Sequence, residues 1–293
     1  MNLRKSLVAR QGSYPFISGD SFRSDADFVL DRGDPPYLAK IIPPLKGNQV
    51  VFCELDFLSN PQSLGEIVAL GKKSFGLNGG KPALVLHNGD FPPNPEQIAE
   101  LVSSHWRVFC PNLVEPAANT TALPVGLENL HHEKNGLVAC FLKRRELNQK
   151  MLPEPPRSFE IFCSFNVSTN PNERELVAQL VRSSRHKFWD KQLRPSDFKD
   201  QISKSFFVLS PPGNGLDCHR TWEAIYLGAV PIIRRGTISA SLAGFLPVWE
   251  VDDWEDALNA SPAQLWEVHA EKKIIPSRLA YYPHWQSLIR DGK

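Results

Sequence analysis

The sequence has no hydrophobic run long enough to cross a membrane. A membrane-spanning helix needs roughly 20 apolar residues, but the run at 224–233 is shorter and contains Gly228 and Pro231. Residues 1–11 carry basic side chains without an apolar stretch behind them, so they do not match a secretory signal. We therefore expect a cytoplasmic protein without a membrane anchor.

An excess of charge of one sign is also missing. The chain carries 33 Lys and Arg residues against 32 Asp and Glu residues, which gives a formal net charge of +1. A balanced chain has no overall field that would attract nucleic acid or anionic lipid. We therefore expect no nucleic-acid partner, and any site for an anion has to be local.

Cysteine pairs and metal-ligand clusters are absent from the sequence as well. The five cysteines include no CxxC pair, so we expect reduced thiols rather than a disulfide framework. His131 and His132 have no third ligand at zinc spacing. Asp25-Ala-Asp27 has the spacing of a metal-diphosphate motif, but it follows Ser24 and precedes an apolar run, which is typical of a capped helix start. We expect neither a metal nor another cofactor.

What the chain does contain is enough apolar material for two folded domains. Apolar side chains make up 42% of its 293 residues and charged ones 22%, so a core can form. Short apolar runs alternate with segments of helical periodicity, which is typical of parallel strands covered by helices. The predicted strands are residues 14–18, 49–54, 82–87, 106–110, 159–165, 205–209 and 229–233. The predicted helices are residues 25–31, 61–71, 94–103, 172–183 and 218–227.

Residues 150–157 contain three prolines among polar residues, which indicates a linker. We therefore predict an α/β fold with two Rossmann-like domains facing a cleft, at 1–150 and 151–261. Residues 262–293 are expected to form a helical segment that packs back toward the N-terminal domain. Ligands of open parallel sheets bind outside the carboxyl ends of the strands, so the chemistry is expected in the loops that follow them.

The most informative stretch is 206–233, which reads as strand, glycine loop, helix and strand. Gly213 and Gly215 flank Asn214 and allow the backbone to approach a ligand closely. Asp217 is placed to cap the helix, whose free N–H groups would point back at the loop. This arrangement predicts a cradle for phosphate.

Three polar side chains share one face of this predicted helix, because Arg220 and His219 lie three and four residues before Glu223. Two basic residues in a first turn oppose the helix dipole unless an anion is bound there. The pattern favours a diphosphate, with Glu223 accepting hydrogen bonds from neighbouring hydroxyl groups such as those of a ribose. The alternative is a salt bridge between Arg220 and Glu223 on a solvated helix face.

Residues 207–233 resemble the C-terminal signature of exostosin-like glycosyltransferases, in which Pro-x-Gly, Arg, Glu-Ala and Gly-x-x-Pro-Ile recur at this spacing. The resemblance covers little more than this stretch. It implies a GT-B fold whose C-terminal domain holds a nucleotide sugar, with Arg220 on the diphosphate and Glu223 on the ribose or sugar. It also implies that the glycine loop, Asp217 and His219 line the phosphate site. The missing anchor fits a bacterial-like enzyme of surface polysaccharide synthesis, and inversion at the anomeric carbon is implied by the family alone.

A second polar cluster leads into the helix predicted at 172–183. Ser164 lies at the end of the strand predicted at 159–165, Asn166 follows it, and Arg174 lies in the first turns of the helix. This order is similar to the donor-phosphate region of GT-B fucosyltransferases, which implies that the three side chains contact the donor. The alternative is that residues 170–172 form only a turn and a helix cap.

An inverting transfer needs a carboxylate or imidazole within hydrogen-bond reach of the acceptor hydroxyl. Asp20 is the first candidate for this base, because it lies in a polar glycine loop directly after the first predicted strand. Asp90, Glu128 and His87 are the other candidates. Asx-Gly turns are often only turns, so the choice among them depends on the geometry of the fold.

The sequence thus predicts a glycosyltransferase that moves a sugar from a nucleoside diphosphate donor to a glycan acceptor. The reaction would need no metal, and its catalytic residues would be Asp20, Arg220 and Glu223. Without a transmembrane segment, contact with a membrane-bound acceptor would be peripheral.

Two alternatives stay open at this stage. The first is an NADP-dependent oxidoreductase, in which Gly213 and Gly215 open a dinucleotide fold and Arg234 and Arg235 bind a 2′-phosphate. Cys218 stands where this fold has its third glycine, which disfavours it. The second is an inactive protein that binds a glycan or a nucleotide.

Overall fold

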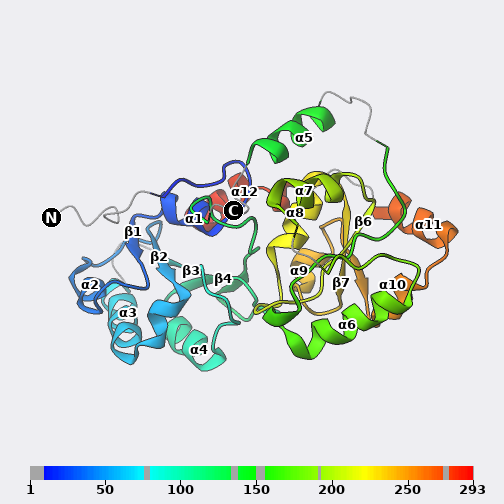
Figure 1. The fold of residues 1–293 in the computed structure, drawn as a ribbon. Helices are drawn as coiled ribbons and strands as arrows, with labels where there is room; N and C mark the ends of the chain where they lie inside the picture. Colours follow the sequence, from blue (N-terminus) through cyan, green and yellow to red (C-terminus); the bar gives the residue numbers. More distant parts are fainter. Residues whose placement is uncertain are drawn as a thin grey trace. The chain divides into compact units, whose positions relative to one another are not determined.

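The computed structural model describes residues 10–75, 80–132, 138–149, 156–190, 193–272 and 277–292. The chain divides into two compact units, drawn in Figure 1 in the colours of the sequence. Unit 1 comprises Met1–Val125, Asn129–His131 and Tyr281–Lys293, and unit 2 comprises Gly126–Glu128 and His132–Ala280. The division therefore falls near 126–132 instead of at 150, and residues 262–280 belong to unit 2. Most of the linker expected at 150–157 lies outside the described residues.

Unit 1 is built on a parallel sheet whose strands follow one another in sequence order. They are β1 (Phe28–Leu30), β2 (Val50–Glu54), β3 (Ala83–His87), β4 (Arg107–Cys110) and β5 (Thr120–Ala122). β2 and β3 are buried along their whole length, as expected for central strands covered on both faces. The strands predicted at 49–54, 82–87 and 106–110 are confirmed, whereas the sequence pattern misses the three-residue strands β1 and β5.

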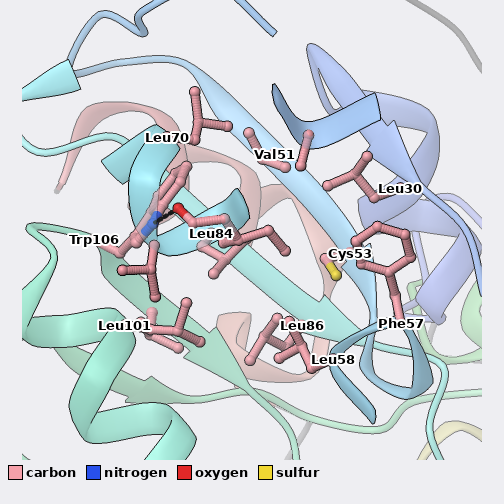
Figure 2. Close-up of a cluster of buried hydrophobic side chains, with 14 of the residues drawn as sticks. Leu30, Val51, Cys53, Phe57, Leu58, Leu70, Leu84, Leu86, Leu101 and Trp106 are labelled. Carbon is pink, nitrogen blue, oxygen red and sulfur yellow. Dashed lines mark hydrogen bonds between the residues drawn. The ribbon is translucent and has the colours of Figure 1, made fainter. Parts of the chain in front are cut away.

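The helices of unit 1 are α1 (Gly19–Asp25), α2 (Tyr37–Ile41), α3 (Pro61–Ser74), α4 (Pro95–Ser103) and α12 (Tyr282–Asp291), with a 3-10 turn η1 (Leu55–Ser59). α2, α3 and α4 pack against the sheet and enclose the hydrophobic core shown in Figure 2. In this core the Trp106 Nε1 donates a hydrogen bond to the Ile67 carbonyl oxygen at 3.1 Å. α12 comes from the far end of the sequence and packs beside α1, where the rings of Tyr282 and Phe22 meet edge to face.

The start of the described chain differs from the sequence prediction. Residues 14–18 form isolated bridges instead of a strand, one of them between Phe16 and Tyr281. A helix follows at once, because the Ser18 side chain accepts a hydrogen bond from Ser21 N and so caps α1. The glycine of the expected loop is therefore the first residue of a helix.

The helix predicted at 25–31 is wrong, since α1 ends at Asp25 and β1 occupies the middle of this range. Asp27 is bound to the sheet instead of capping a helix. Its Oδ2 accepts a hydrogen bond from Val50 N at 2.8 Å and pairs with Arg290 Nη1 at 2.5 Å. Partners distant in sequence thus override the local helix signal.

Unit 2 contains a second parallel sheet in the order β6-β7-β8. Its strands are β6 (Phe207–Leu209), β7 (Val230–Arg234) and β8 (Trp249–Val251). The strand predicted at 159–165 is replaced by bridges, of which Phe162 with Val208 runs parallel to β6. The helices are α5 (Ala139–Gln149), α6 (Pro171–Ser183), α7 (Pro195–Ser203), α8 (His219–Leu227), α9 (Ala240–Ala243), α10 (Trp254–Leu258) and α11 (Pro262–Lys272), with 3-10 turns η2 (Val167–Thr169) and η3 (Arg278–Ala280).

The core of unit 2 lies between its sheet and the helices α6, α10 and α11, which contribute buried residues such as Val177, Ala257 and Leu265. The predicted α/β class, with parallel strands in each half of the chain, is confirmed. Among the helices described, none combines the length and the apolar character that a membrane span requires.

Candidate functional site

The strand–loop–helix–strand order predicted at 206–233 is confirmed as β6, loop, α8 and β7. Ser210 N donates to the Ile232 carbonyl oxygen at 2.9 Å and so continues the ladder past the end of β6. The Ser210 hydroxyl also lies 2.9 Å from Thr221 Oγ1 in the first turn of α8. These contacts fix the glycine loop between the carboxyl end of a parallel strand and a helix N-terminus, a common position for ligand sites in α/β folds.

The first turn of α8 has no side-chain cap. Its N-cap residue is Cys218, which makes no capping hydrogen bond, so the cap predicted at Asp217 is wrong. Both oxygens of Asp217 accept a hydrogen bond from Trp222 Nε1, at 3.0 and 2.8 Å. Trp222 is fully buried, and a buried indole N–H requires an acceptor. The amide groups at the start of α8 are therefore not capped by a side chain.

Arg220 projects from this first turn with unsatisfied donors. Its Nε and Nη1 are buried and have no hydrogen-bond acceptor in the described part of the chain. Its guanidinium lies 5.7 Å from the centre of the Phe165 ring. Within the described chain no ion pair joins Arg220 to Glu223 or to any other carboxylate, so the solvated salt bridge is not formed. A buried cationic donor without an acceptor costs free energy, which an anionic ligand would recover.

Arg174 is buried on α6 and is held by the backbone around it. Its Nε donates to the Pro212 carbonyl oxygen at 2.7 Å and its Nη2 to that of Pro211 at 3.0 Å. Its Nη1 donates to the Asn166 carbonyl oxygen at 2.8 Å and to Thr169 Oγ1. Burial, and then the nearby charge of Arg220, lower the pKa of Arg174 to about 10. Arg174 therefore joins two loops and adds positive charge beside Arg220.

The other side chains predicted to bind the donor differ in their burial and in their hydrogen bonds. Asn166 caps η2 by accepting a hydrogen bond from Ser168 N at 3.1 Å. Ser164 is buried, and Asn214 is exposed at the tip of the glycine loop. His219 Nδ1 lies 2.8 Å from the Gly126 carbonyl oxygen. The structure thus places Asn166 in a local hydrogen bond and His219 against a carbonyl oxygen 93 positions earlier in the chain.

Glu223 lies one turn further along α8 and is 3% exposed. Its Oε1 has no hydrogen-bond partner among the described residues. Burial raises the pKa of Glu223 to about 7, although the positive charges of Lys199 and Arg220 act in the opposite direction. A carboxyl group that titrates near neutrality can accept or donate a hydrogen bond, which suits a ligand hydroxyl.

Glu223 should make stability depend on pH with a definite sign. Folding raises its pKa from 4.5 to about 7, so the folded state holds the proton more tightly than the unfolded state. The stabilisation is complete below the unfolded pKa and is lost as the pH rises through about 7, a loss of roughly 3 kcal/mol. Urea unfolding should show wild type losing roughly this much more than Glu223→Gln between about pH 4.5 and about pH 8. Equal pH dependence in both proteins would contradict the burial of an ionisable group.

The base candidates occupy different places. Asp20 lies in the first turn of α1, fully buried, and not in a glycine loop as predicted. His87 ends β3, where its Nδ1 accepts a hydrogen bond from Asn88 N at 2.8 Å. Asp90 is exposed, and Glu128 belongs to unit 2, where its charge contributes to the raised pKa of Glu223.

Sequence reasoning missed a group that the fold brings to Asp20. Asp20 Oδ2 lies 3.0 Å from His131 Nδ1, and Asp20 Oδ1 lies 3.7 Å from Arg10 Nη1, which also donates to Glu54 Oε1 at 3.0 Å. Asp20 and His131 are 111 positions apart, so no local pattern could reveal the pair.

No protein-family model and no curated protein matches the chain. Among solved structures it is similar to the alpha,alpha-trehalose 6-phosphate synthase from Burkholderia multivorans, with 9% identity and a TM-score of 0.43 over 93% of this chain and 73% of that chain. It is also similar to the UDP-forming alpha,alpha-trehalose-phosphate synthase from Burkholderia vietnamiensis, with 9% identity and a TM-score of 0.42 over the same shares. Similarities this low do not assign the chain to a family.

Proposed function

We propose that unit 2 binds the diphosphate of a nucleotide sugar and that the protein is a glycosyltransferase. The observation that carries the proposal is the pair of buried Arg220 donors, Nε and Nη1, which have no acceptor among the residues that the structure describes. They belong to the first turn of an uncapped helix that follows a glycine loop. A diphosphate supplies acceptor oxygens and negative charge at such a place.

The chemistry of glycosyl transfer suits these groups. As the bond from the anomeric carbon to the diphosphate oxygen breaks, negative charge develops on the departing diphosphate. Arg220 and the amide groups of α8 would stabilise that charge, and the buried cation of Arg174 would add to the field. We propose that these groups act without a metal and that Glu223 binds a hydroxyl of the ribose or of the sugar.

The finer assignments belong to the same proposal. The enzyme would be of the exostosin-like GT-B type and would invert the configuration at the anomeric carbon. Its acceptor would be a glycan in the cytoplasmic synthesis of a surface polysaccharide. Gly213 lets the glycine loop pack closely against Arg174, because a Cβ there would lie 3.0 Å from Arg174 Nη2. Arg174 is assigned to positioning the loop.

The oxidoreductase alternative depended on two arginines at the end of β7. Arg234 Nη1 lies 3.6 Å from Glu173 Oε1, and Arg235 pairs with Asp252 at 2.8 Å and Glu250 at 3.7 Å. Both cations already face carboxylates, which disfavours a 2′-phosphate beside them.

The test is a comparison of nucleotides by thermal unfolding. UDP or GDP should raise the melting temperature by several degrees, since a ligand at 100 times its dissociation constant stabilises by about 2.7 kcal/mol. NADP should have no effect, and a response to NADP alone would favour the oxidoreductase. If neither UDP nor GDP changes the melting temperature, the proposal fails. Release of UDP or GDP from UDP- and GDP-sugars distinguishes an enzyme from an inactive binding protein.

A further inference from the structure

Lysines gather at one edge of the sheet in unit 1, the edge at which its strands begin. A helix that connects two parallel strands runs back along the sheet, so it ends where the next strand begins. The last turns of α2 and α3 and the segments before β2 and β3 therefore meet at this edge. They carry Lys40, Lys46, Lys72, Lys73 and Lys81, of which the first four are exposed and the last is partly exposed.

Hydrogen bonds join the ends of the two helices, which pack against each other (Figure 1). Lys73 Nζ donates to the carbonyl oxygens of Lys40 at 3.1 Å and Ile42 at 2.6 Å. In the loop that follows α2, Leu45 N donates to Ser74 Oγ at 2.9 Å. The ends of α2 and α3 and this loop are therefore held side by side.

The same loop reaches the starts of β3 and β4. A Cβ on Gly47 would lie 2.7 Å from the Gly80 Cα, so the two glycines are in close contact. Arg107 Nε donates to the Lys81 carbonyl oxygen at 3.1 Å, and its Nη2 to that of Gly47 at 3.5 Å. These segments form one surface, named here the lysine edge and defined as residues 40–48, 72–75, 80–81 and 105–107.

The protein does not balance the charge of the lysine edge. Its residues include no Asp or Glu, and among the described residues none of its five lysines forms an ion pair with a carboxylate. The acids on neighbouring elements are Glu66 on α3, Asp291 at the end of α12, and Asp25 and Asp27, which both pair with Arg290. A chain with a net charge of +1 thus has a local positive field at this edge.

Apolar side chains are exposed among these lysines. Phe75, directly after α3, is 59% exposed, and Ile41, at the end of α2, is 47% exposed. The Phe75 ring stacks on His105 with the ring centres 3.8 Å apart. Residues 43–44, both prolines, are exposed as well. One exposed apolar side chain is ordinary, but several within a lysine cluster are typical of a surface that binds a membrane.

An anionic bilayer complements both features of the lysine edge. A lysine near such a surface strengthens binding by about fivefold, and apolar side chains enter the boundary between headgroups and acyl chains. A nucleic acid would complement the lysines, but Ile41 and the prolines have no flat ring face on which its bases could stack. The apolar side chains therefore favour the membrane.

We propose that the lysine edge binds the surface of an anionic membrane, with Ile41 and Phe75 in the headgroup region and the lysine ammonium groups at the lipid phosphates. The lysine stems cover the apolar side chains while their charged ends reach the headgroups. Contact of this kind needs no membrane-spanning helix. The proposal is independent of the glycosyl transfer proposed above, because it concerns unit 1 alone.

The first test is co-sedimentation of the whole protein with lipid vesicles. Vesicles of phosphatidylglycerol and phosphatidylcholine should bind the protein at about 0.15 M salt, and vesicles of phosphatidylcholine alone should bind it far more weakly. Binding to the anionic vesicles should fall by about tenfold or more at about 1 M salt, where charges are screened beyond about 3 Å. Equal binding to both kinds of vesicle, or binding to neither, would overturn the proposal.

The second test removes three of the lysines. A variant with Lys40→Gln, Lys46→Gln and Lys72→Gln should bind the anionic vesicles about 100-fold more weakly, at about fivefold for each lysine. Lys73 is left in place because its ammonium group holds the end of α2. The melting temperature should stay near that of wild type, since the three side chains are exposed.

A control variant removes the same charge from exposed positions of unit 2. It carries Lys187→Gln, Arg194→Gln and Lys204→Gln, and it should bind the anionic vesicles as wild type does. If the control loses as much vesicle binding as the lysine-edge variant, only the net charge of the protein matters, and the proposal is wrong.

The third test separates a membrane from a nucleic acid. A variant with Ile41→Ser and Phe75→Ser keeps every charge and should bind the anionic vesicles about tenfold more weakly or worse, because less apolar surface leaves water. The control variant changes two exposed apolar residues of unit 2, Leu176→Ser and Phe245→Ser, and should bind like wild type. If Ile41→Ser with Phe75→Ser binds vesicles like wild type and single-stranded RNA displaces the protein from them, the surface is a nucleic-acid site instead.

Discussion

Replacing Arg220 with alanine should raise the dissociation constant for UDP or GDP by about 100- to 10,000-fold and hardly change the melting temperature of the unliganded protein. The two buried donors would each lose a charge-assisted hydrogen bond to phosphate, worth about 1.5–3 kcal/mol. The folded protein loses little, because these donors have no acceptor in it and because the charge of Arg220 opposes that of Arg174. Titration calorimetry and thermal unfolding measure the two effects separately.

Two further variants make the Arg220 result specific. Arg220→Lys keeps the charge but loses the planar fork, so it should bind more weakly than wild type and more tightly than Arg220→Ala. Arg235→Ala removes the same charge from an exposed position in unit 2 that pairs with Asp252, and it should bind like wild type. Equal losses of affinity for UDP or GDP in Arg220→Ala and Arg235→Ala would mean that binding depends only on the net charge of the protein. That result would contradict a direct contact between Arg220 and the diphosphate.

Replacing Arg174 with alanine should destabilise the protein strongly, by roughly 3–5 kcal/mol. The variant removes the hydrogen bonds that Arg174 donates to the carbonyl oxygens of Asn166, Pro211 and Pro212. The Asn166 and Pro212 oxygens keep one other donor each, Thr169 Oγ1 and Asn170 Nδ2. A hydrogen bond from a charged group contributes about 1.5–3 kcal/mol, and the missing side chain also leaves a cavity. Nucleotide binding should weaken as well, because the glycine loop loses its attachment to α6. Urea unfolding measures the first effect and calorimetry the second.

The same helix offers a matched control for Arg174. Arg182 lies on α6 but is exposed, and it pairs with Asp190 at 2.6 Å. Exposed ion pairs contribute about 0–1 kcal/mol, so Arg182→Ala should change the free energy of unfolding by no more than that. If Arg174→Ala is as stable as Arg182→Ala, the hydrogen bonds of Arg174 do not hold the loops together.

The parts of the fold that the sequence predicts are those whose burial pattern is local. β2 and β3 are apolar up to their last residues, Glu54 and His87. The helix α8 shows its periodicity in the sequence and is capped by Gly228, whose φ of 78° favours glycine. The short strands β1 and β5 carry too few residues for a pattern. In the sequence, Asp27 resembles part of a capped helix start. In the structure its side chain instead contacts Val50 N and Arg290.

The site was predictable to the extent that its residues follow one another along the chain. The glycine loop, Arg220 and Glu223 lie within one strand–loop–helix segment, so their spacing places them together. The sequence predicts Asp217 as the cap of this helix, but its carboxylate accepts the hydrogen bond of the Trp222 indole instead. The contact between Asp20 and His131 depends on how α1 packs against residues 129–131. The spacing of residues along the sequence does not predict such packing.

The most direct measurement is a crystal structure of the protein with bound UDP or GDP. We expect diphosphate oxygens within about 2.7–2.9 Å of Arg220 Nε and Nη1, at the start of α8, with Glu223 beside a hydroxyl of the ligand. A nucleotide bound elsewhere, with the Arg220 donors satisfied by a carboxylate of the protein, would contradict it.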